Sequence, residues 1–338
     1  MRWIYLKKSI PYVLIAVTIF VSIIILPTIL VSVFDKEKVD LKVDNNKKMA
    51  DKVNDSEVLV SVFRTKSNKV DEVPLEEYVM GVVASEMPAD FEIEALKAQA
   101  LSARTNIVLS KINGIKSGKG EVSDSTSDQV YKSKEELKAI WGNDFTWKIT
   151  KIQKAVKATN GQILTYNGSP ITASFFSTSN GHTENSEEYW STALPYLKSV
   201  ESPWDLDSPK YQAQTSVSVS NFEKKLNVKL SSAINVGIVK KKTIGGRIAE
   251  IEISGKLFTG RKIREELGLR STDFSFTRNG KEIIVHTKGY GHGVGMSQYG
   301  ANGMATDGKK YSDIIFYYYQ GVQITKIDSL AEVALIKK

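Results

Sequence analysis

The hydrophobic pattern of the chain begins with one long run near the N-terminus. Residues 9–34 contain no charged side chain, and at a helical rise of about 1.5 Å per residue they reach about 39 Å, more than the roughly 30 Å hydrocarbon core of a bilayer. A cleaved signal peptide usually has an apolar region of only about 7–15 residues before small residues at the cleavage site, which residues 31–33 match poorly. The pattern therefore predicts an uncleaved transmembrane helix over residues 9–34.

The charges around this run predict its orientation. The residues before it carry cations and no acidic side chain, so the positive-inside bias keeps residues 1–8 in the cytoplasm and places the chain after the span outside. Residues 35–56 mix both charge signs without helical or strand periodicity, which predicts a tether. Because no linker is evident beyond it, residues 57–338 are expected to form one composite extracytoplasmic domain.

Shorter patterns predict the fold class of that domain. Apolar alternation and β-branched residues indicate strands, and helical spacing indicates short helices, but the two types do not alternate regularly. The expected class is therefore α+β rather than a doubly wound parallel sheet. The predicted strands are Val58–Arg64, Ile163–Tyr166, Ile171–Ser177, Thr215–Val219, Arg247–Ile253 and Glu282–Thr287, the short helices are Asn221–Leu226, Arg261–Leu267 and Tyr311–Tyr319, and residues 113–133 form a long loop.

A helix predicted between Pro74 and Pro88 carries a carboxylate on its apolar face. Its apolar residues recur at i, i+3, i+4, i+7 and i+8, and the next position of that series is Glu86. Burial and the nearby helix C-terminus both disfavour a charged carboxylate, so the pKa of Glu86 is expected to rise toward the range of a general acid. Fraying near Pro88, which would turn Glu86 into solvent, is the alternative. The apolar stripe consists of Leu75, Tyr78, Val79, Val82 and Val83.

The helix that follows carries two cations on its apolar stripe. Lys97 and Arg104 lie two turns apart among apolar residues. Such cations extend to solvent, pair with a carboxylate, or face an anionic or polyhydroxylated ligand from one side. Pairing of either cation with Glu86 would lower the pKa of that carboxyl and weaken its interpretation as an acid.

Two further segments combine polar side chains with glycine. Residues 174–185 (SFFSTSNGHTEN) place hydroxyl groups, a glycine turn and His182 after a predicted strand, and aromatic residues follow. Hydroxyls beside aromatic rings suit a sugar, although a turn followed by core aromatics has the same composition. Residues 289–300 (GYGHGVGMSQYG) do not fit G-x-G-x-x-G and are not followed by GK[ST], so nucleotide binding is not supported. His292 in this segment is a candidate ligand or base, whereas His286 lies in a strand pattern.

Composition limits the chemistry further. The chain of 338 residues has no cysteine, which excludes disulfides, cysteine-ligated zinc and thiol nucleophiles, and three histidines make a multi-histidine metal site improbable. No G-x-S-x-G elbow supports a serine hydrolase. The net charge of +8 is spread along the chain and is compatible with an anionic wall polymer, a membrane surface or nucleic acid as partner.

Three ordered blocks behind the predicted anchor resemble the stage II sporulation protein D family, which are peptidoglycan lytic transglycosylases of endospore-forming bacteria. The blocks are VPLEEYVMGVVASEMPADFEIEALKAQALSAR, FFSTSNGHTEN with its LPYLKSVESPWD continuation, and GYGHGVGMSQYGANGMA. The resemblance implies cleavage between N-acetylmuramic acid (MurNAc) and N-acetylglucosamine (GlcNAc) without water, which leaves a 1,6-anhydro end. It also implies that the protein acts on peptide-free glycan strands during forespore engulfment, from the septal side of the mother-cell membrane.

The resemblance also assigns roles to residues. It implies that Glu86 is the catalytic acid and base and that Lys97 and Arg104 are required, and two residues of LPYLKSV match further positions important in the family. The expected substrate-binding residues are Lys97, Arg104, Gln129, Ser177, Ser179, His182, Tyr196, Lys198, His292, Ser297 and Gln298.

A metal site is not expected. In the segment that corresponds to residues 124–131 (DSTSDQVY), many relatives carry Cys before the glutamine, and some of them bind a metal there. Here Asp128 stands in that place before Gln129. We therefore expect no metal and no cofactor, and Gln129 is retained as a contact to the wall glycan.

The family context implies partners and leaves two alternatives open. Expected partners are peptidoglycan glycan strands, a sporulation amidase (stage II sporulation protein P), a membrane protein (stage II sporulation protein M) and the cytoplasmic membrane, without nucleic acid. A hydrolytic muramidase would need a second carboxylate about 5–9 Å from Glu86, for which Glu184, Glu187 and Glu188 are candidates. A glycan-binding scaffold that activates the amidase would not need Glu86.

Overall fold

The structure of the protein is a computed structural model that describes residues 58–114 and 116–326. The predicted cytoplasmic segment (1–8), transmembrane helix (9–34) and tether (35–56) lie outside these residues. Within the described ranges, none of the helices has both the length and the apolar character needed to cross a bilayer.

Helices and strands alternate irregularly along the described chain. The helices are α2 (Leu75–Glu86), α3 (Ile93–Asn113), α4 (Lys134–Trp141), α5 (Phe145–Ala158), α6 (Ser186–Trp190), α7 (Val219–Leu226), α8 (Gly260–Leu267), α9 (Gln298–Thr306) and α10 (Tyr311–Tyr318), with short 3₁₀ turns η2 (Gly142–Asp144) and η3 (Pro203–Asp207). The strands are β1 (Leu59–Arg64), β2 (Lys69–Pro74), β3 (Val122–Ser123), β4 (Gln162–Tyr166), β5 (Ser169–Pro170), β6 (Phe175–Phe176), β7 (Gln212–Ser218), β8 (Ile238–Lys242), β9 (Ile248–Ile253), β10 (Lys256–Thr259), β11 (Asp273–Asn279), β12 (Glu282–Lys288), β13 (Met296–Ser297) and β14 (Gln323–Lys326).

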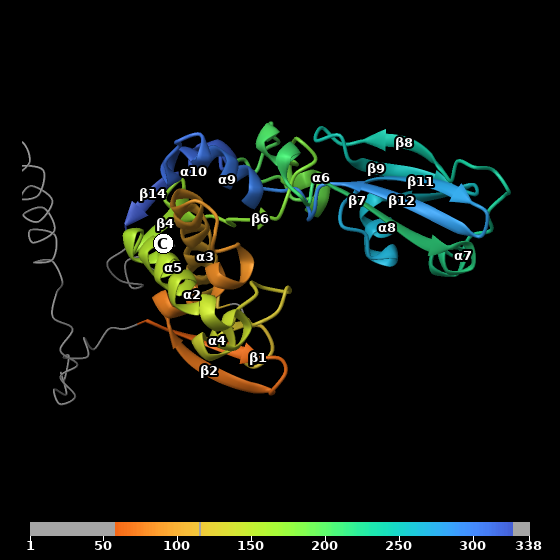
Figure 1. Cartoon of the computed structure of the whole chain (residues 1–338). Helices are drawn as coiled ribbons and strands as arrows, with labels where there is room; N and C mark the ends of the chain where they lie inside the picture. Colours follow the sequence, from red (N-terminus) through yellow and green to blue (C-terminus); the bar gives the residue numbers. More distant parts are fainter. Residues whose placement is uncertain (1–57, 115, 327–338) are drawn as a thin grey trace, which may run out of the picture. The chain divides into compact units, whose positions relative to one another are not determined.

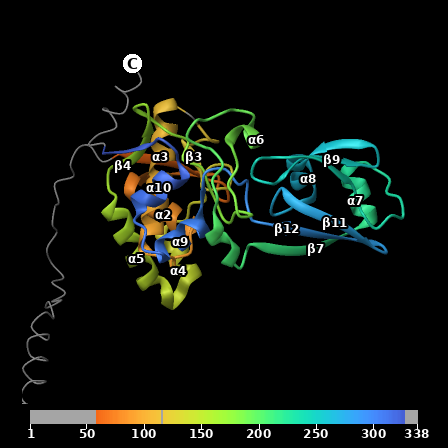
Figure 2. The ribbon, with the colours of Figure 1, turned by 90° about the horizontal axis from the view of Figure 1, so that it is seen from above.

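Helix α3 lies at the centre of the larger hydrophobic core. It contacts α2, α5, α9, α10 and β4, and these helices are grouped around it in Figure 2. Many of its core positions are alanine, such as Ala98 and Ala103, and their small side chains allow the neighbouring elements to approach closely. The helix ends at Gly114, which takes the left-handed conformation (φ 61°) and donates its N–H to carbonyls of the last turn.

Three small sheets border this core. β1 pairs antiparallel with β2 and parallel with the short β3. β4 lies between β5 and β14. β6 pairs parallel with β13 through Phe175↔Met296 and Phe176↔Ser297, which joins two segments far apart in the sequence.

Residues 212–288 form a second hydrophobic core with sheets of their own. β12 pairs antiparallel with both β7 and β11, and β9 pairs with both β8 and β10 (Figure 1). Helices α7 and α8 begin at side-chain caps, Ser218 and Thr259, and contribute apolar residues to the same core. The first and last residues of the segment, Gln212 and Lys288, pair with each other. The segment therefore leaves and re-enters the rest of the chain through adjacent strands.

The described elements confirm a mixed α/β class and most of the predicted elements. Strands β1, β4, β7, β9 and β12 and helices α7, α8 and α10 overlap their predicted ranges, and α2 and α3 lie where two successive helices were expected. Helices α4, α5, α6 and α9 and strands β2, β8, β10, β11 and β14 were not predicted. The predicted strand Ile171–Ser177 is wrong except at Phe175–Phe176. Before that pair, the N–H of Thr172 donates to the Tyr196 hydroxyl and that of Ala173 donates to the Asn106 amide oxygen. Side chains thus satisfy the backbone where a neighbouring strand was expected.

Candidate active site

One pocket in the described chain brings together five of the residues predicted for the site. Its volume is about 840 Å³, which is in the usual range for small-molecule sites. The five residues are Glu86, Gln129, Ser177, His292 and Gln298, and the wall also includes Asn106, Asp128, Trp190, Lys210, Arg264 and Tyr290.

Glu86 is the last residue of α2. The apolar stripe predicted for this helix is buried apart from the half-buried Leu75, and the backbone turns to an extended conformation at Met87 (φ −122°, ψ 135°). The Glu86 side chain is half-buried, and its Oε1 accepts a hydrogen bond of 2.7 Å from the backbone N–H of Val130. No described hydrogen bond occupies Oε2, so one carboxyl oxygen is held in place while the other remains available to a ligand.

The environment of Glu86 favours its protonated form. Burial raises the pKa of the Glu86 carboxyl above its ordinary value, against the opposing effects of the Val130 N–H and the positive charge of Lys132. This is the direction that a general acid requires. Neither alternative interpretation holds, because the carboxyl is fixed by Val130 rather than turned away, and neither Lys97 nor Arg104 pairs with it.

Residues 130–132, which include the Val130 N–H bound to Glu86, pack closely against α2. A Cβ added at Gly81 would lie 2.4 Å from the Tyr131 ring and 2.6 Å from the carbonyl oxygen of Lys132. The two segments can therefore approach this closely only with glycine at position 81. Tyr131 in turn stacks on Tyr78, with ring centroids 5.4 Å apart. This packing sets the position of the N–H that binds the Glu86 carboxylate.

Residues 126–129, just before Val130, also line the pocket, and two of them were considered in the sequence analysis. Gln129 is 6% exposed; its Nε2 donates to the Ala103 carbonyl at 3.4 Å, and its Oε1 is buried without a described partner. Asp128 accepts the N–H and hydroxyl of Ser123 on Oδ2, at 2.9 and 2.7 Å. Gln129 is therefore a buried part of the pocket lining held by the Ala103 carbonyl, and Asp128 is the carboxylate that shares the lining with Glu86.

His292 lies in an aromatic cluster at the pocket wall. The rings of Phe176, Tyr189 and Trp190 lie 5.6, 5.7 and 5.2 Å from the imidazole, centroid to centroid. Burial lowers the pKa of His292 to about 3, and the N–H of Val294 donates to its Nδ1. His292 is therefore neutral near pH 7 with its Nδ1 lone pair occupied, which makes it a part of the wall rather than a general base.

The two cations of α3 do not line this pocket. Arg104 is fully buried, and its Nε and Nη2 donate to the two carboxylate oxygens of Glu76 at 2.7 and 2.6 Å. Lys97 pairs with Glu94 at 2.7 Å and lies over the Tyr311 ring. The structure therefore differs from the expectation that both cations face a ligand here. Lys97 pairs with Glu94 on its own helix, and Arg104 pairs with Glu76 on α2.

Other predicted contacts are also held away from the pocket lining. Ser179 and Ser297 are fully buried and donate their hydroxyls to the Asp205 carboxylate at 2.7 and 2.6 Å. The Tyr196 hydroxyl accepts the backbone N–H of Thr172, which itself lines the pocket. These residues thus support the wall from behind, since their polar groups are occupied by the protein itself.

The carboxylates considered as a second catalytic group do not line the pocket either. Glu184 is 2% exposed, and its Oε1 accepts from the Arg247 guanidinium at 3.0 Å. Glu187 pairs with Lys198 at 2.7 Å, which also accounts for that lysine, and Glu188 is exposed. A second carboxylate for hydrolysis would therefore be Asp128 rather than one of these three.

Sequence reasoning missed part of the wall. Lys210, Arg264 and Tyr290 come from three separate segments that no local pattern connects, whereas Trp190 belongs to the aromatic run that suggested a sugar site. His182 is exposed and does not belong to the lining. Across the described ranges, no three His, Asp or Glu side chains lie close enough together to hold a metal ion.

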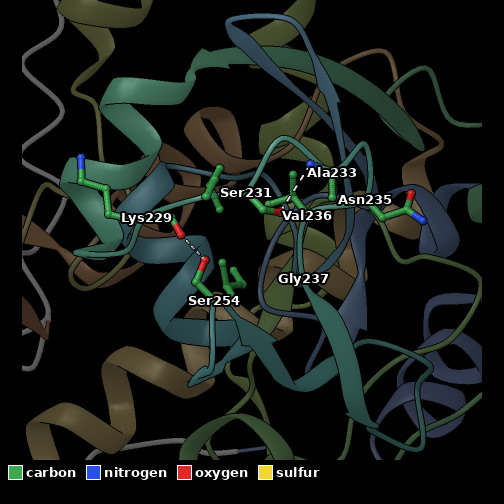
Figure 3. Close-up of a pocket in the computed structure, with 9 residues that line it drawn as sticks. Lys229, Ser231, Ala233, Asn235, Val236, Gly237 and Ser254 are labelled. Carbon is green, nitrogen blue, oxygen red and sulfur yellow. Dashed lines mark hydrogen bonds between the residues drawn. The ribbon is translucent and has the colours of Figure 1, made fainter.

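A second, smaller pocket lies in the β-rich segment 212–288. Its volume is about 280 Å³, and Figure 3 shows Lys229, Ser231, Asn235 and Ser254 around it. The side chain of Lys229 is 91% exposed, and no carboxylate lines this pocket. It therefore lacks the acid that the larger pocket provides.

Comparisons with known proteins agree with the motif resemblance. A family model described as "SpoIID: Stage II sporulation protein" matches residues 64–166. Stage II sporulation protein D of Bacillus subtilis (strain 168) is 50% identical over 94% of this chain and 96% of its own length, and that of Bacillus amyloliquefaciens is 49% identical over 97% and 99%. The amidase enhancer of Bacillus subtilis (strain 168) is 30% identical over 72% of this chain and 40% of its own length.

Proposed function

Since the chain belongs to the stage II sporulation protein D family, we propose that it is a membrane-anchored lytic transglycosylase of peptidoglycan. It cleaves MurNAc–GlcNAc bonds in peptide-free glycan strands and leaves 1,6-anhydro ends, in septal wall remodelling and forespore engulfment. The observation that supports this most is the Glu86 carboxyl, which lines a pocket of about 840 Å³ and has a raised pKa. Among the described residues it forms no ion pair.

Glu86 acts first as an acid and then as a base. Protonated Glu86 donates its proton to the glycosidic oxygen as the bond from that oxygen to C1 of MurNAc breaks. The resulting Glu86 carboxylate then accepts the proton of the MurNAc C6 hydroxyl while the C6 oxygen bonds to C1. This step closes the anhydro ring and restores the acid, so that one carboxyl group serves both steps and no water is consumed.

The remaining wall supports the binding of sugar rings. Gln129 lines the pocket as the proposed glycan contact, and Trp190 and Tyr290 offer flat apolar surfaces to the ring faces. Because His292 is neutral, it adds no positive charge that would lower the pKa of Glu86.

We infer the cellular setting from the same family. Residues 9–34 anchor the protein as a single span, with the N-terminus in the cytoplasm and the glycan-cleaving domain on the septal side of the mother-cell membrane. The amidase, stage II sporulation protein P, removes stem peptides and so supplies the substrate, and the membrane protein stage II sporulation protein M is a further partner.

A second candidate function is a glycan-binding scaffold that activates the amidase. The similarity to a protein named amidase enhancer favours it. In this case the pocket binds glycan without cleaving it, and Glu86 is dispensable. The two functions are compatible in one molecule, and they differ in what a change at Glu86 removes.

The test uses the full chain, purified in a mild detergent, with peptide-free glycan strands. Products are read by mass spectrometry for the parent protein, for Glu86→Gln and for Glu188→Gln, a matched change at an exposed carboxylate outside the pocket. We expect anhydro-ended fragments from the parent and from Glu188→Gln, and none from Glu86→Gln.

Other product patterns would contradict the proposal. Reducing-end fragments, heavier by one water, would indicate a hydrolase, and their loss in Asp128→Asn would identify the second carboxylate. Absence of cleavage together with undiminished amidase stimulation by Glu86→Gln would indicate the scaffold.

A further inference from the structure

Two cations of the pocket wall have no carboxylate partner in the described chain. Arg264 is half-buried and donates to neutral groups, from Nε to the Leu269 carbonyl at 3.2 Å and from Nη1 to the Tyr189 hydroxyl at 2.8 Å. Lys210 is also half-buried, and its Nζ lies 5.8 Å from the centroid of the Tyr290 ring. Both line the pocket that contains Glu86.

Four of the six other arginines in the described chain have an acidic partner; Arg270 and Arg278 have none, but neither lines the pocket. Arg64, Arg104, Arg247 and Arg261 each pair with an acidic side chain. Arg264 lacks such a partner although it is partly removed from water, where an unpaired charge is costly. A hydroxyl and a carbonyl hold its guanidinium in a fixed orientation, and no described bond occupies Nη2.

The charges within the pocket leave these cations available to a ligand. Its carboxylates are Glu86, whose environment favours the protonated form, and Asp128, which is bound by Ser123. Arg264 donates to the Tyr189 hydroxyl, and the Tyr189 ring packs against the His292 imidazole on the wall. The pocket therefore combines an acid for the reaction with a separate positive region.

We propose that Lys210 and Arg264 bind the free lactyl carboxylate of a muramic acid residue. The inference rests on the proposed function, because it concerns the same pocket and the same glycan. In peptidoglycan only muramic acid carries a lactyl group; its carboxylate is anionic when the stem peptide is absent and becomes a neutral amide when the peptide is attached. A guanidinium and an ammonium recognise the first form through charge-assisted hydrogen bonds and gain little from the second.

The positions of the aromatic rings agree with this assignment. Lys210 lies by the Tyr290 ring, and Arg264 hydrogen-bonds Tyr189, which packs on Trp190. A sugar ring packed on Trp190 or Tyr290 would therefore bring its substituents toward one of the two cations. The positive wall thus supplies a physical reason for selecting peptide-free strands over peptide-bearing or uncharged ones.

The test measures binding rather than turnover. The full chain with Glu86→Gln, in mild detergent, is titrated with the tetrasaccharide (GlcNAc–MurNAc)₂ carrying free lactyl acids and with its lactyl methyl ester. We expect the acid to bind about tenfold more tightly, with a preference that weakens as salt increases. Lys210→Met or Arg264→Met should each reduce the affinity for the acid about tenfold and leave the ester unchanged.

Controls separate charge from packing. Arg270→Met removes a cation that also lies on the Tyr290 ring but does not line the pocket, and it should preserve the preference for the acid. Lys210→Arg should retain most of it. Because Arg264 also binds Tyr189, its variant is compared with the parent by thermal melting, and Lys210→Met decides the question if Arg264→Met unfolds.

The outcomes distinguish this inference from the proposed function. The carboxylate assignment is overturned if Glu86→Gln binds the acid and the ester equally, or if adding Lys210→Met reduces the affinity for both equally. Cleavage by the unmodified protein would still stand in either case. If the unmodified protein cleaves nothing but prefers the acid, with that preference lost in Lys210→Met, the assignment stands and the proposed function fails.

Discussion

Glu86 and Asp205 are both carboxyl groups partly or fully removed from water, but they lie in different surroundings. Burial raises the pKa of both groups above their ordinary values. Asp205 is fully buried and accepts the hydroxyls of three serines at 2.6 to 2.7 Å. Glu86 is half-buried, lines a pocket and accepts one backbone N–H. A raised pKa therefore does not by itself identify a catalytic acid; a free oxygen on an open pocket separates the two cases.

The serines around Asp205 show how the protein itself occupies hydroxyls that the sequence analysis expected to contact a ligand. Ser179, Ser202 and Ser297 come from three segments that Asp205 joins. Ser179 and Ser297 lie in the two glycine-containing blocks and were expected to bind the glycan, whereas Ser202 was not predicted; here all three hydroxyls satisfy a buried carboxylate. The glycine-rich blocks build the support behind the pocket as well as part of its surface.

The largest expected effect is the loss of cleavage in Glu86→Gln. Removing a general acid costs about 10²–10⁴-fold in rate, and glutamine keeps an oxygen for the Val130 N–H. The measurement is the initial rate of anhydro-end formation per folded molecule, with circular dichroism as the folding control. A variant that cleaves at the parent rate, or one that is unfolded, would contradict the active-site assignment.

The next effect concerns stability rather than rate. Arg104→Met should lower the free energy of unfolding by about 3 kcal/mol, because it removes the buried guanidinium that pairs with the half-buried Glu76 carboxylate. That value is at the lower end of the range for buried pairs, since the Glu76 side chain is 35% exposed. Urea unfolding measures it. Full stability with lost turnover would instead restore the ligand role predicted from the sequence.

Asp205→Ala should destabilise the protein by about 1–3 kcal/mol, because buried serine hydroxyls lose their acceptor. Molecules that remain folded should cleave glycan with unchanged product type. Thermal melting combined with mass spectrometry checks both parts. A change from anhydro to reducing ends would mean that Asp205 takes part in the reaction, which its burial argues against.

Lys97→Ala should have a smaller effect. The Lys97–Glu94 pair spans i and i+3 on one helix, and such pairs contribute about 0.2–0.5 kcal/mol. We expect a matching decrease in unfolding free energy and a cleavage rate close to that of the parent. A rate reduced tenfold at full stability would show that the lysine leaves Glu94 and reaches the substrate.

The smallest effect is a pH-dependent difference in stability between the parent and Glu86→Gln. Because the folded-state pKa of Glu86 is raised, the parent loses stability as pH rises from the ordinary carboxyl value through the raised one, and the glutamine variant does not. The variant should therefore melt at a higher temperature near neutral pH, and the difference should vanish in acid. A constant difference at all pH values would contradict the shift.

The features predicted best are those that a single element determines. The apolar stripe of α2 continues to Glu86, so one helix was enough to identify the half-buried carboxylate. Helix α5 was missed because lysines interrupt its pattern and its fully buried face is small, with Ile152, Ala155 and Val156. A weak stripe of that kind becomes clear only once α2 and α3 cover it.

The partners of charged groups that pair across different elements were beyond the reach of the sequence. Arg104 lies on an apolar stripe whether it faces a ligand or Glu76, and only the packing of α2 on α3 decides between them. Lys210, Arg264 and Tyr290 meet at one wall because separate segments converge there. Such convergence depends on tertiary structure, which no local periodicity encodes.

The pairing of Gln212 with Lys288 also bears on the order in which the chain folds. The contact between β6 and β13 closes a long loop, and the entropic cost of closure rises with loop length. Residues 212–288 have a hydrophobic core of their own, so their early folding would bring their ends together and shorten that loop. Pulsed hydrogen exchange should then detect protection in β12 before β13. Residues 212–288, which include Arg264, would then fold before the part of the pocket lining that contains His292.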